Sequence, residues 1–131
     1  VYERVQTDVV AVSTLLMKRL QDAVAQQGGR LIFLLQYGGG HIASWKEEPD
    51  YARAVWDNYR RMGIEGINTW GPLKDILATK GESGLKELFV MHGGGKTYGH
   101  MSEQGNRFVA ALLARQIAGR APGASKGGSG A

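Results

Sequence analysis

The feature that most constrains the fold is a run of five consecutive apolar residues, Leu31 to Leu35, between two glycine-rich segments. Its length and its lack of alternation between apolar and polar residues are typical of a strand with both faces covered, as in parallel sheets. The sequence therefore predicts a buried parallel strand over residues 31–35. The segment Gly38-Gly39-Gly40 follows this strand at its carboxyl end, and no helix is expected to begin where the glycines end.

An amphipathic helix is predicted before this strand, because apolar residues recur at steps of three and four. The members of this stripe are Val5, Val9, Val12, Leu16, Leu20 and Val24. The pair Gly28-Gly29 is expected to end the helix, where the chain needs a positive φ. After the strand, a loop through Trp45 leads to a second helix that begins at the acidic segment 47–50 and ends near Gly63.

The second half of the chain continues the alternation of strands and helices. A short strand is predicted over residues 64–69, a small helix from Gly71 to Gly81, and a third apolar patch over residues 88–91. The last helix is expected to be capped by the hydroxyl of Ser102 and to end at Gly119. Its predicted buried stripe is Phe108, Val109, Leu112, Leu113 and Ile117.

This order of elements is typical of an α/β domain with right-handed crossovers. We predict one domain over residues 1–120 and a flexible tail over residues 121–131, which are too poor in apolar side chains to form a core. The pattern contains at most three strands, and its first element is a helix without a strand before it. The N-terminal portion of the sheet is therefore expected to be missing from this chain.

Composition narrows the classes of function. The 16 Lys and Arg against 12 Asp and Glu give a net charge of +4, but the basic residues are scattered, so no nucleic-acid partner is predicted. The absence of cysteine excludes disulfides and thiolate metal sites. No membrane span is predicted, because no apolar run approaches the roughly 20 residues that cross a bilayer. No signal peptide is visible, and the compartment stays open.

The segment from Tyr98 to Ala110 is the most informative for chemistry. His100 is expected on a tight loop, two residues before the predicted cap Ser102, where it would stand exposed at the mouth of the sheet. An imidazole exchanges its proton near neutral pH and can accept a proton from a nucleophile. From spacing alone, an ordinary surface histidine at a helix start remains an alternative.

This segment resembles the terminal block of the SGNH/GDSL hydrolases, in which a histidine is followed by Gly-Asn or Gly-His and an Ala- and Leu-rich final helix. The matching residues are His100, Gly105-Asn106 and Val109-Ala110. The resemblance implies a three-layer α/β/α sandwich with a parallel, flavodoxin-like sheet, of which this chain is the C-terminal part. It also implies that His100 is the general base that activates a serine, with no cofactor and no metal. The implied substrate is an ester-bearing small molecule, lipid or acylated carbohydrate.

Two departures from that family pattern matter. The family usually has an aspartate two or three residues before the histidine, to hold the imidazole; this chain has Tyr98 and Thr97 there. Their hydroxyls, or a backbone carbonyl, could orient the ring of His100. The Gly-Asp-Ser nucleophile block is also missing, and Ser13 is rejected as a nucleophile because it lies inside a predicted helix. The serine is therefore expected from the upstream part of the same polypeptide, and the chain alone is expected to be inactive. A weakened triad, a serine–histidine dyad and a non-catalytic binding or accessory domain stay open.

Two glycine-rich motifs allow other interpretations. The segment His92-Gly93-Gly94-Gly95 resembles the oxyanion loop of lipase-type α/β-hydrolases, but the Gly-x-Ser-x-Gly elbow of that family does not follow it. A fragment of such an enzyme and a simple mobile loop beside His100 are the alternatives. Tyr37, Gly38 and Gly39 are predicted to line a substrate cleft, because ligands of open α/β sheets bind at the carboxyl ends of the strands.

A metal site made of His41, His92 and His100 is not predicted. Their spacing contains no short ligand pair, and no carboxylate cluster accompanies them. The substrate within the ester class and the oligomeric state are left open by the sequence.

Overall fold

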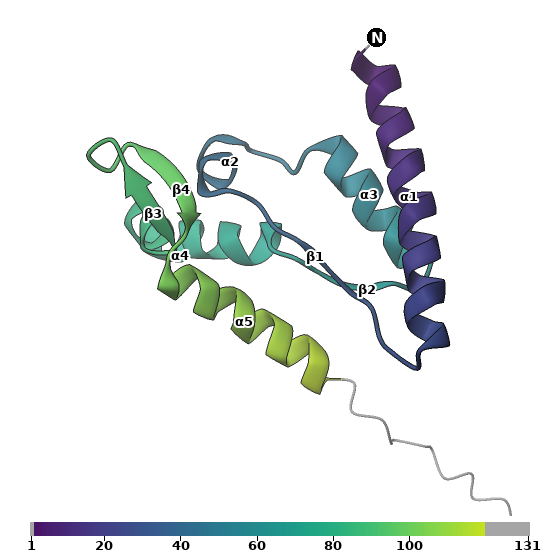
Figure 1. The fold of residues 1–131 in the computed structure, drawn as a ribbon. Coiled ribbons are helices and arrows are strands. Elements are labelled where there is room, and N and C mark those ends of the chain that lie inside the picture. The colour runs from purple at the N-terminus through teal and green to yellow at the C-terminus, as the bar shows by residue number, and fades with distance from the viewer. Residues whose placement is uncertain (1, 120–131) are drawn as a thin grey trace, which may run out of the picture.

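The computed structural model describes residues 2–119, with side chains from residue 8 onward (Figure 1). The predicted tail over residues 121–131 lies outside this range. The chain forms a mixed α/β structure with nine helices and strands in the described range. They are α1 (Tyr2–Gln26), β1 (Ile32–Leu35), α2 (Gly39–Ser44), α3 (Asp50–Arg61), β2 (Glu65–Asn68), α4 (Trp70–Glu87), β3 (Phe89–His92), β4 (Thr97–Met101) and α5 (Glu103–Ala118).

The apolar run forms β1, which pairs in parallel with β2, as the sequence predicted for residues 31–35 and 64–69. Ile32 lies opposite Glu65, and the register continues to Leu35 opposite Asn68. The residues of β1 are half-buried instead of buried on both faces. The reason is that this sheet has two strands within the described residues, so β1 gains a neighbour on one edge only.

The predicted first helix is confirmed as α1, which ends at Gln26 just before Gly28 with its φ of 68°. It runs along α3, and Asn58 Nδ2 donates to Thr14 Oγ1 at 3.3 Å. Its apolar stripe, however, is largely exposed. The exposed fraction is 60% for Val9 and 59% for Leu16. The described part of the chain therefore leaves most of this stripe in contact with solvent.

The glycine-rich segment after β1 begins a short helix, α2, and the expectation that no helix starts there is wrong. Gly38 takes the N-cap position in an extended conformation, with φ −73° and ψ 150°. The side chain of Ile42 is fully buried and anchors the turn to the core. A single apolar anchor in six residues is too little to show a helical period in the sequence.

The predicted stop of a helix at Gly81 is confirmed, but a second helical segment follows it directly. Gly81 has φ 69° and ψ −171°, which breaks α4 into two parts. Leu73 in the first part and Leu85 in the second are both fully buried. The second part was missed because Leu85 is its only large apolar residue before Leu88.

The apolar patch over residues 88–91 forms β3, but β3 does not join the parallel sheet. It pairs antiparallel with β4 in a hairpin. The turn contains Gly93, Gly94 and Gly95, all with positive φ. The prediction that His100 sits on a tight loop is wrong, because His100 lies inside β4. Thr97–Met101 shows no apolar alternation, so its pairing is set by the turn and not by a period in the sequence.

The buried core lies at the carboxyl end of β1, between α2, α4 and the hairpin. Its members are Tyr37, Ile42, Ala52, Leu73, Leu85, Leu88 and Phe89. This core holds the β3–β4 hairpin against the segment that follows β1. The relative positions of His100 and the glycine-rich segment therefore depend on it.

The last helix begins as predicted, since Ser102 Oγ accepts a hydrogen bond from the Gly105 backbone N–H at 3.1 Å. Of the predicted stripe, Val109 is buried and Phe108 is half-buried, whereas Ile117 is 53% exposed. The helix thus contacts the core through its first turns. No described helix is both long enough and apolar enough to pass through a bilayer.

Candidate functional site

A cavity of about 250 Å³ lies where the carboxyl end of β1 meets the hairpin. The segment after β1 and strand β4 supply its walls. Its lining residues include Gln36, Tyr37, Gly38, Gly99, His100 and Met101. The structure thus brings three predicted site residues, Tyr37, Gly38 and His100, to one cavity, while Gly39 lies outside its lining. The carboxyl end of a parallel strand is where ligands of open α/β sheets bind.

A β-bulge directs His100 away from the core. Two steps along β3 correspond to three steps along β4, as the cross-strand pairs show. These pairs are Phe89 with Met101 and Met91 with Tyr98. Gly99 and His100 therefore stand together opposite Val90. Without the extra residue, His100 would share the face of Tyr98, because alternate residues of a strand point the same way. With it, His100 is exposed while Tyr98 faces the core.

Gly39 supports this arrangement from the other side of the junction. It is buried, and a Cβ atom built on it would overlap Cδ1 of the Tyr98 ring. The ring of Tyr98 also meets Phe89 edge-on, with centroids 5.6 Å apart. Gly39 therefore acts as a contact surface for the hairpin, which fixes the glycine-rich segment relative to the strand that carries His100.

Tyr37 is held by a polar cluster at the carboxyl ends of both parallel strands. Its hydroxyl donates to Glu48 Oε1 at 2.6 Å, and Asn68 Nδ2 donates to the same oxygen at 2.6 Å. Burial raises the pKa of Tyr37 above its usual value, and the hydrogen bond to Glu48 and the charge of Glu48 raise it further. The phenol is therefore a neutral donor committed to Glu48. Any contact of Tyr37 with a ligand falls to its backbone and ring.

Thr69 joins the ends of the two strands. Its side chain is fully buried, and Oγ1 accepts from the Tyr37 backbone N–H at 3.1 Å. The same hydroxyl lies 3.2 Å from the carbonyl oxygen of Leu35, to which it donates. One hydroxyl thereby satisfies two backbone groups at the point where β1 turns toward the cavity. Thr69 thus fixes the backbone of Tyr37, which lines the cavity.

The imidazole of His100 has no ion-pair or hydrogen-bond partner within the described residues. The hydroxyl of Tyr98, considered above as an orienting group, is buried and likewise has no hydrogen-bond partner there. Burial raises the pKa of Tyr98; the charge of Glu82 adds to the increase and that of Lys86 opposes it. The hydroxyl of Tyr98 therefore does not orient the imidazole in this structure.

The other two histidines lie in separate surroundings. His41 stacks on Trp45 with ring centroids 4.2 Å apart. His92 lies over Gly99, whose Cβ, if present, would be 2.5 Å from the ring nitrogen Nε2. Over residues 8–119, no group of three or more His, Asp or Glu gathers in a way that could hold a metal ion.

The segment His92-Gly93-Gly94-Gly95 forms the turn of the hairpin. The backbone N–H groups of Gly95 and Lys96 both donate to the carbonyl oxygen of His92, at 3.1 Å each. An oxyanion loop needs such N–H groups free to face the substrate. The positive φ angles of the three glycines are what the turn requires, so the turn itself accounts for this motif.

Glu48, Asn68 and Thr69 were missed as site residues in the sequence. Asn68 and Thr69 are the last two residues of the predicted strand over residues 64–69, which was a usable signal, because parallel strands end at a common edge of the sheet. Glu48 gave no such signal, since it comes from a loop that the sequence places at no particular distance from either strand.

Comparisons with known proteins give no relative for this chain. No protein-family model matches it. No curated protein and no solved structure matches it either.

Proposed function

We propose that this chain is the C-terminal part of a serine ester hydrolase of the SGNH type, and that His100 is its general base. The observation that carries the proposal is the bulge in β4, which turns His100 out of the core and onto a cavity at the carboxyl end of β1. The proposal includes a three-layer α/β/α sandwich. In that arrangement, further strands from outside these residues would extend the parallel pair β1–β2.

The proposed reaction begins with a serine hydroxyl supplied by a segment outside these 131 residues. Its oxygen attacks the ester carbonyl, and His100 accepts the proton from the hydroxyl. His100 then donates this proton to the leaving alcohol as the tetrahedral intermediate collapses to an acyl-enzyme. Water, deprotonated by the same imidazole, releases the acid and regenerates the serine. The chemistry uses neither a cofactor nor a metal.

The surroundings of His100 favour a serine–histidine dyad over a triad within the described residues. No carboxylate and no hydroxyl bonds to its imidazole there. In a triad, the third residue holds the correct tautomer and stabilises the imidazolium. Here the direction of the side chain follows from the backbone geometry of the bulge.

The same observation favours a second candidate, a non-catalytic SGNH-like domain that keeps the cavity for binding. An imidazole without a carboxylate partner has no group to fix its tautomer or to stabilise the imidazolium during the reaction. The two candidates differ in what they require outside this chain: the hydrolase needs a nucleophilic serine, and the binding domain does not.

The coding sequence upstream of residue 1 gives the first test. The hydrolase requires a Gly-Asp-Ser block directly after a strand in the same reading frame. A complete upstream sequence without such a block would overturn the hydrolase proposal and leave the binding domain. The 131-residue chain by itself is expected to hydrolyse p-nitrophenyl acetate no faster than free imidazole at the concentration of its three histidines. Saturable turnover by this chain above that background would contradict an external nucleophile.

A further inference from the structure

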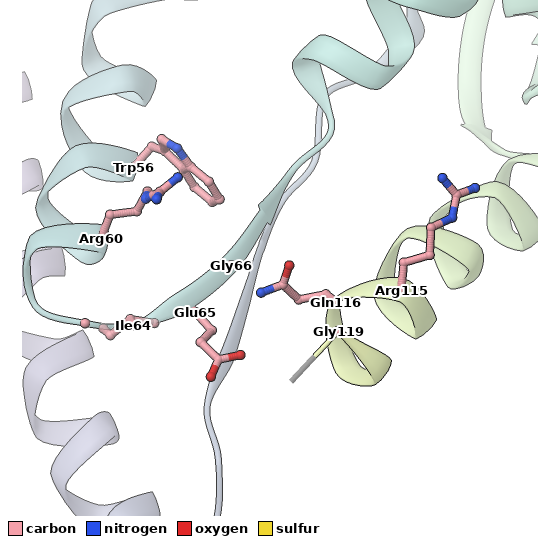
Figure 2. A pocket seen from close by; sticks show the side chains of 9 residues that line it. Trp56, Arg60, Ile64, Glu65, Gly66, Arg115, Gln116 and Gly119 are labelled. Atoms are coloured by element: carbon pink, nitrogen blue, oxygen red, sulfur yellow. The ribbon is translucent and has the colours of Figure 1, made fainter. Parts of the chain in front are cut away.

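A second cavity lies at the opposite end of the parallel sheet from His100. Its volume is about 420 Å³, and Figure 2 shows helix α3 on one side, helix α5 on the other and the amino end of β2 between them. Its lining includes the side chains of Trp56, Arg60, Glu65, Arg115 and Gln116.

Gly66 lines this cavity, and its lack of a side chain leaves room for the indole of Trp56. Glu65 and Gly66 point to opposite faces of β2, as successive residues of a strand do. The indole of Trp56 lies over Gly66, and a Cβ there would come within 2.7 Å of Trp56 Cζ3. Trp56 is half-buried, so part of its ring borders the cavity. A glycine at residue 66 therefore allows the ring of Trp56 to pack directly on the backbone of β2.

Two arginines border the cavity from different helices. The guanidinium of Arg60 lies over the ring of Trp56, with its Cζ 6.0 Å from the ring centroid. Arg115 comes from the last turn of α5, and Figure 2 shows it on the side opposite Arg60. Neither arginine forms an ion pair within the described part of the chain. Both are therefore available to an anion.

The remaining charged group of the cavity is already compensated. Glu65 accepts from Arg30 Nε at 2.9 Å, so its carboxylate is matched by a cation from outside the cavity. With Arg30 paired to Glu65, the charges of Arg60 and Arg115 remain in excess. The amide of Gln116 adds a neutral donor and acceptor on the α5 side.

We propose that this cavity binds a small phosphate monoester, with the organic part against Trp56, the phosphate beside Arg60, and the exposed side chain of Arg115 turning inward from α5 to meet it (Figure 2). A phosphate monoester carries a charge of about −1.5 to −2 near neutral pH, which matches two guanidinium groups. Arginine binds such oxygens through two parallel hydrogen bonds. The volume lies in the range of small-molecule pockets, roughly 300–1,000 Å³, so it suits an organic phosphate better than a bare ion.

The test uses phenyl phosphate as the probe and the indole N–H signals in ¹H–¹⁵N spectra of the chain as the readout. The Trp56 signal, assigned with the variant Trp56→Phe, is expected to shift in a saturable way, while those of Trp45 and Trp70 stay in place. Arg60→Gln and Arg115→Gln are each expected to weaken binding about tenfold, because each removes a charge-assisted contact.

Matched controls are Arg53→Gln on α3 and Arg107→Gln on α5. These arginines pair with Asp50 and Glu103 outside the cavity, and they carry the same change in charge. The control variants are expected to retain affinity within about twofold, because exposed charges beyond a Debye length are screened. Equal weakening by the controls would show non-specific attraction and overturn the site. An unshifted Trp56 signal, tighter binding of benzoate, or equal affinity for inorganic phosphate would also overturn the proposal.

Discussion

The ring of Tyr98 lies directly on the backbone of Gly39, leaving no room for a side chain at residue 39. This contact joins two segments that are distant in the sequence, the glycine-rich turn after β1 and the strand that carries His100. Both segments border the cavity of the proposed active site. Together with the buried core, the packing of this aromatic ring on this glycine thus sets how far His100 stands from the end of the parallel sheet.

Substitution of Gly39 tests this contact. We expect Gly39→Ala to lower the free energy of unfolding by about 1–3 kcal/mol, the usual cost of inserting a methyl group into a packed site. Urea denaturation measures the change. The control is Gly40→Ala, because a Cβ there meets nothing within 4 Å. An Ala at 40 is expected to be neutral or slightly stabilising, since it lies in α2. Equal stability of both variants would contradict the packing described.

The buried hydroxyl of Thr69 is expected to stabilise the carboxyl ends of β1 and β2. Thr69→Val keeps the shape but leaves the Tyr37 backbone N–H without its acceptor. We expect a loss of about 1–3 kcal/mol in the free energy of unfolding, the cost of an unsatisfied buried group. Thr79→Val is the control, because Thr79 is exposed and bonds only within its own helix. A loss no larger than that of the control would show that the hydroxyl of Thr69 is dispensable.

The raised pKa of Tyr37 predicts a loss of stability in alkaline solution. The fold favours the neutral phenol, first through burial and then through Glu48. Its stabilisation is complete below the unfolded pKa of about 10 and is lost as the pH rises above that value toward the folded pKa. Wild type is therefore expected to lose stability above that pH more steeply than Tyr37→Phe. Urea denaturation at several alkaline pH values measures this difference, and parallel curves would contradict it.

The hydroxyl of Tyr98 is expected to contribute nothing to stability. It is buried without a hydrogen-bond partner in the described chain, so Tyr98→Phe removes an uncompensated polar group. The variant is expected to be as stable as wild type or more stable by about 1 kcal/mol. Thermal unfolding followed by circular dichroism gives the comparison. A clear loss of stability would reveal a bond of this hydroxyl and reopen its role beside His100.

Local signals made part of the fold predictable. The apolar run at residues 31–35 and the glycines at 28 and 81 marked a strand and two helix ends, and each depends on residues close in the sequence. The cap of α5 by Ser102 belongs to the same class. The helix α1 was predictable from its apolar period. The exposure of its apolar stripe was not, because exposure depends on which other segments pack against the helix.

The candidate site was less predictable, because its geometry comes from pairing between strands. Whether His100 faces the core or the cavity depends on one extra residue in β4 relative to β3, which appears only once the register is known. The cluster of Glu48, Tyr37 and Asn68 likewise joins three separate segments. The residue types in these places were visible in the sequence, but their distances were not.

The most direct test of the account is the rate of ester hydrolysis by a polypeptide that joins these residues to the proposed serine-bearing segment. His100→Ala is compared with His41→Ala, whose imidazole is also exposed but stacks on Trp45 away from the cavity lining. The account predicts that His100→Ala lowers kcat/KM for p-nitrophenyl acetate at least about a hundredfold, the smallest usual contribution of a general base. It also predicts that His41→Ala leaves this rate unchanged. An undiminished rate in His100→Ala would contradict the account.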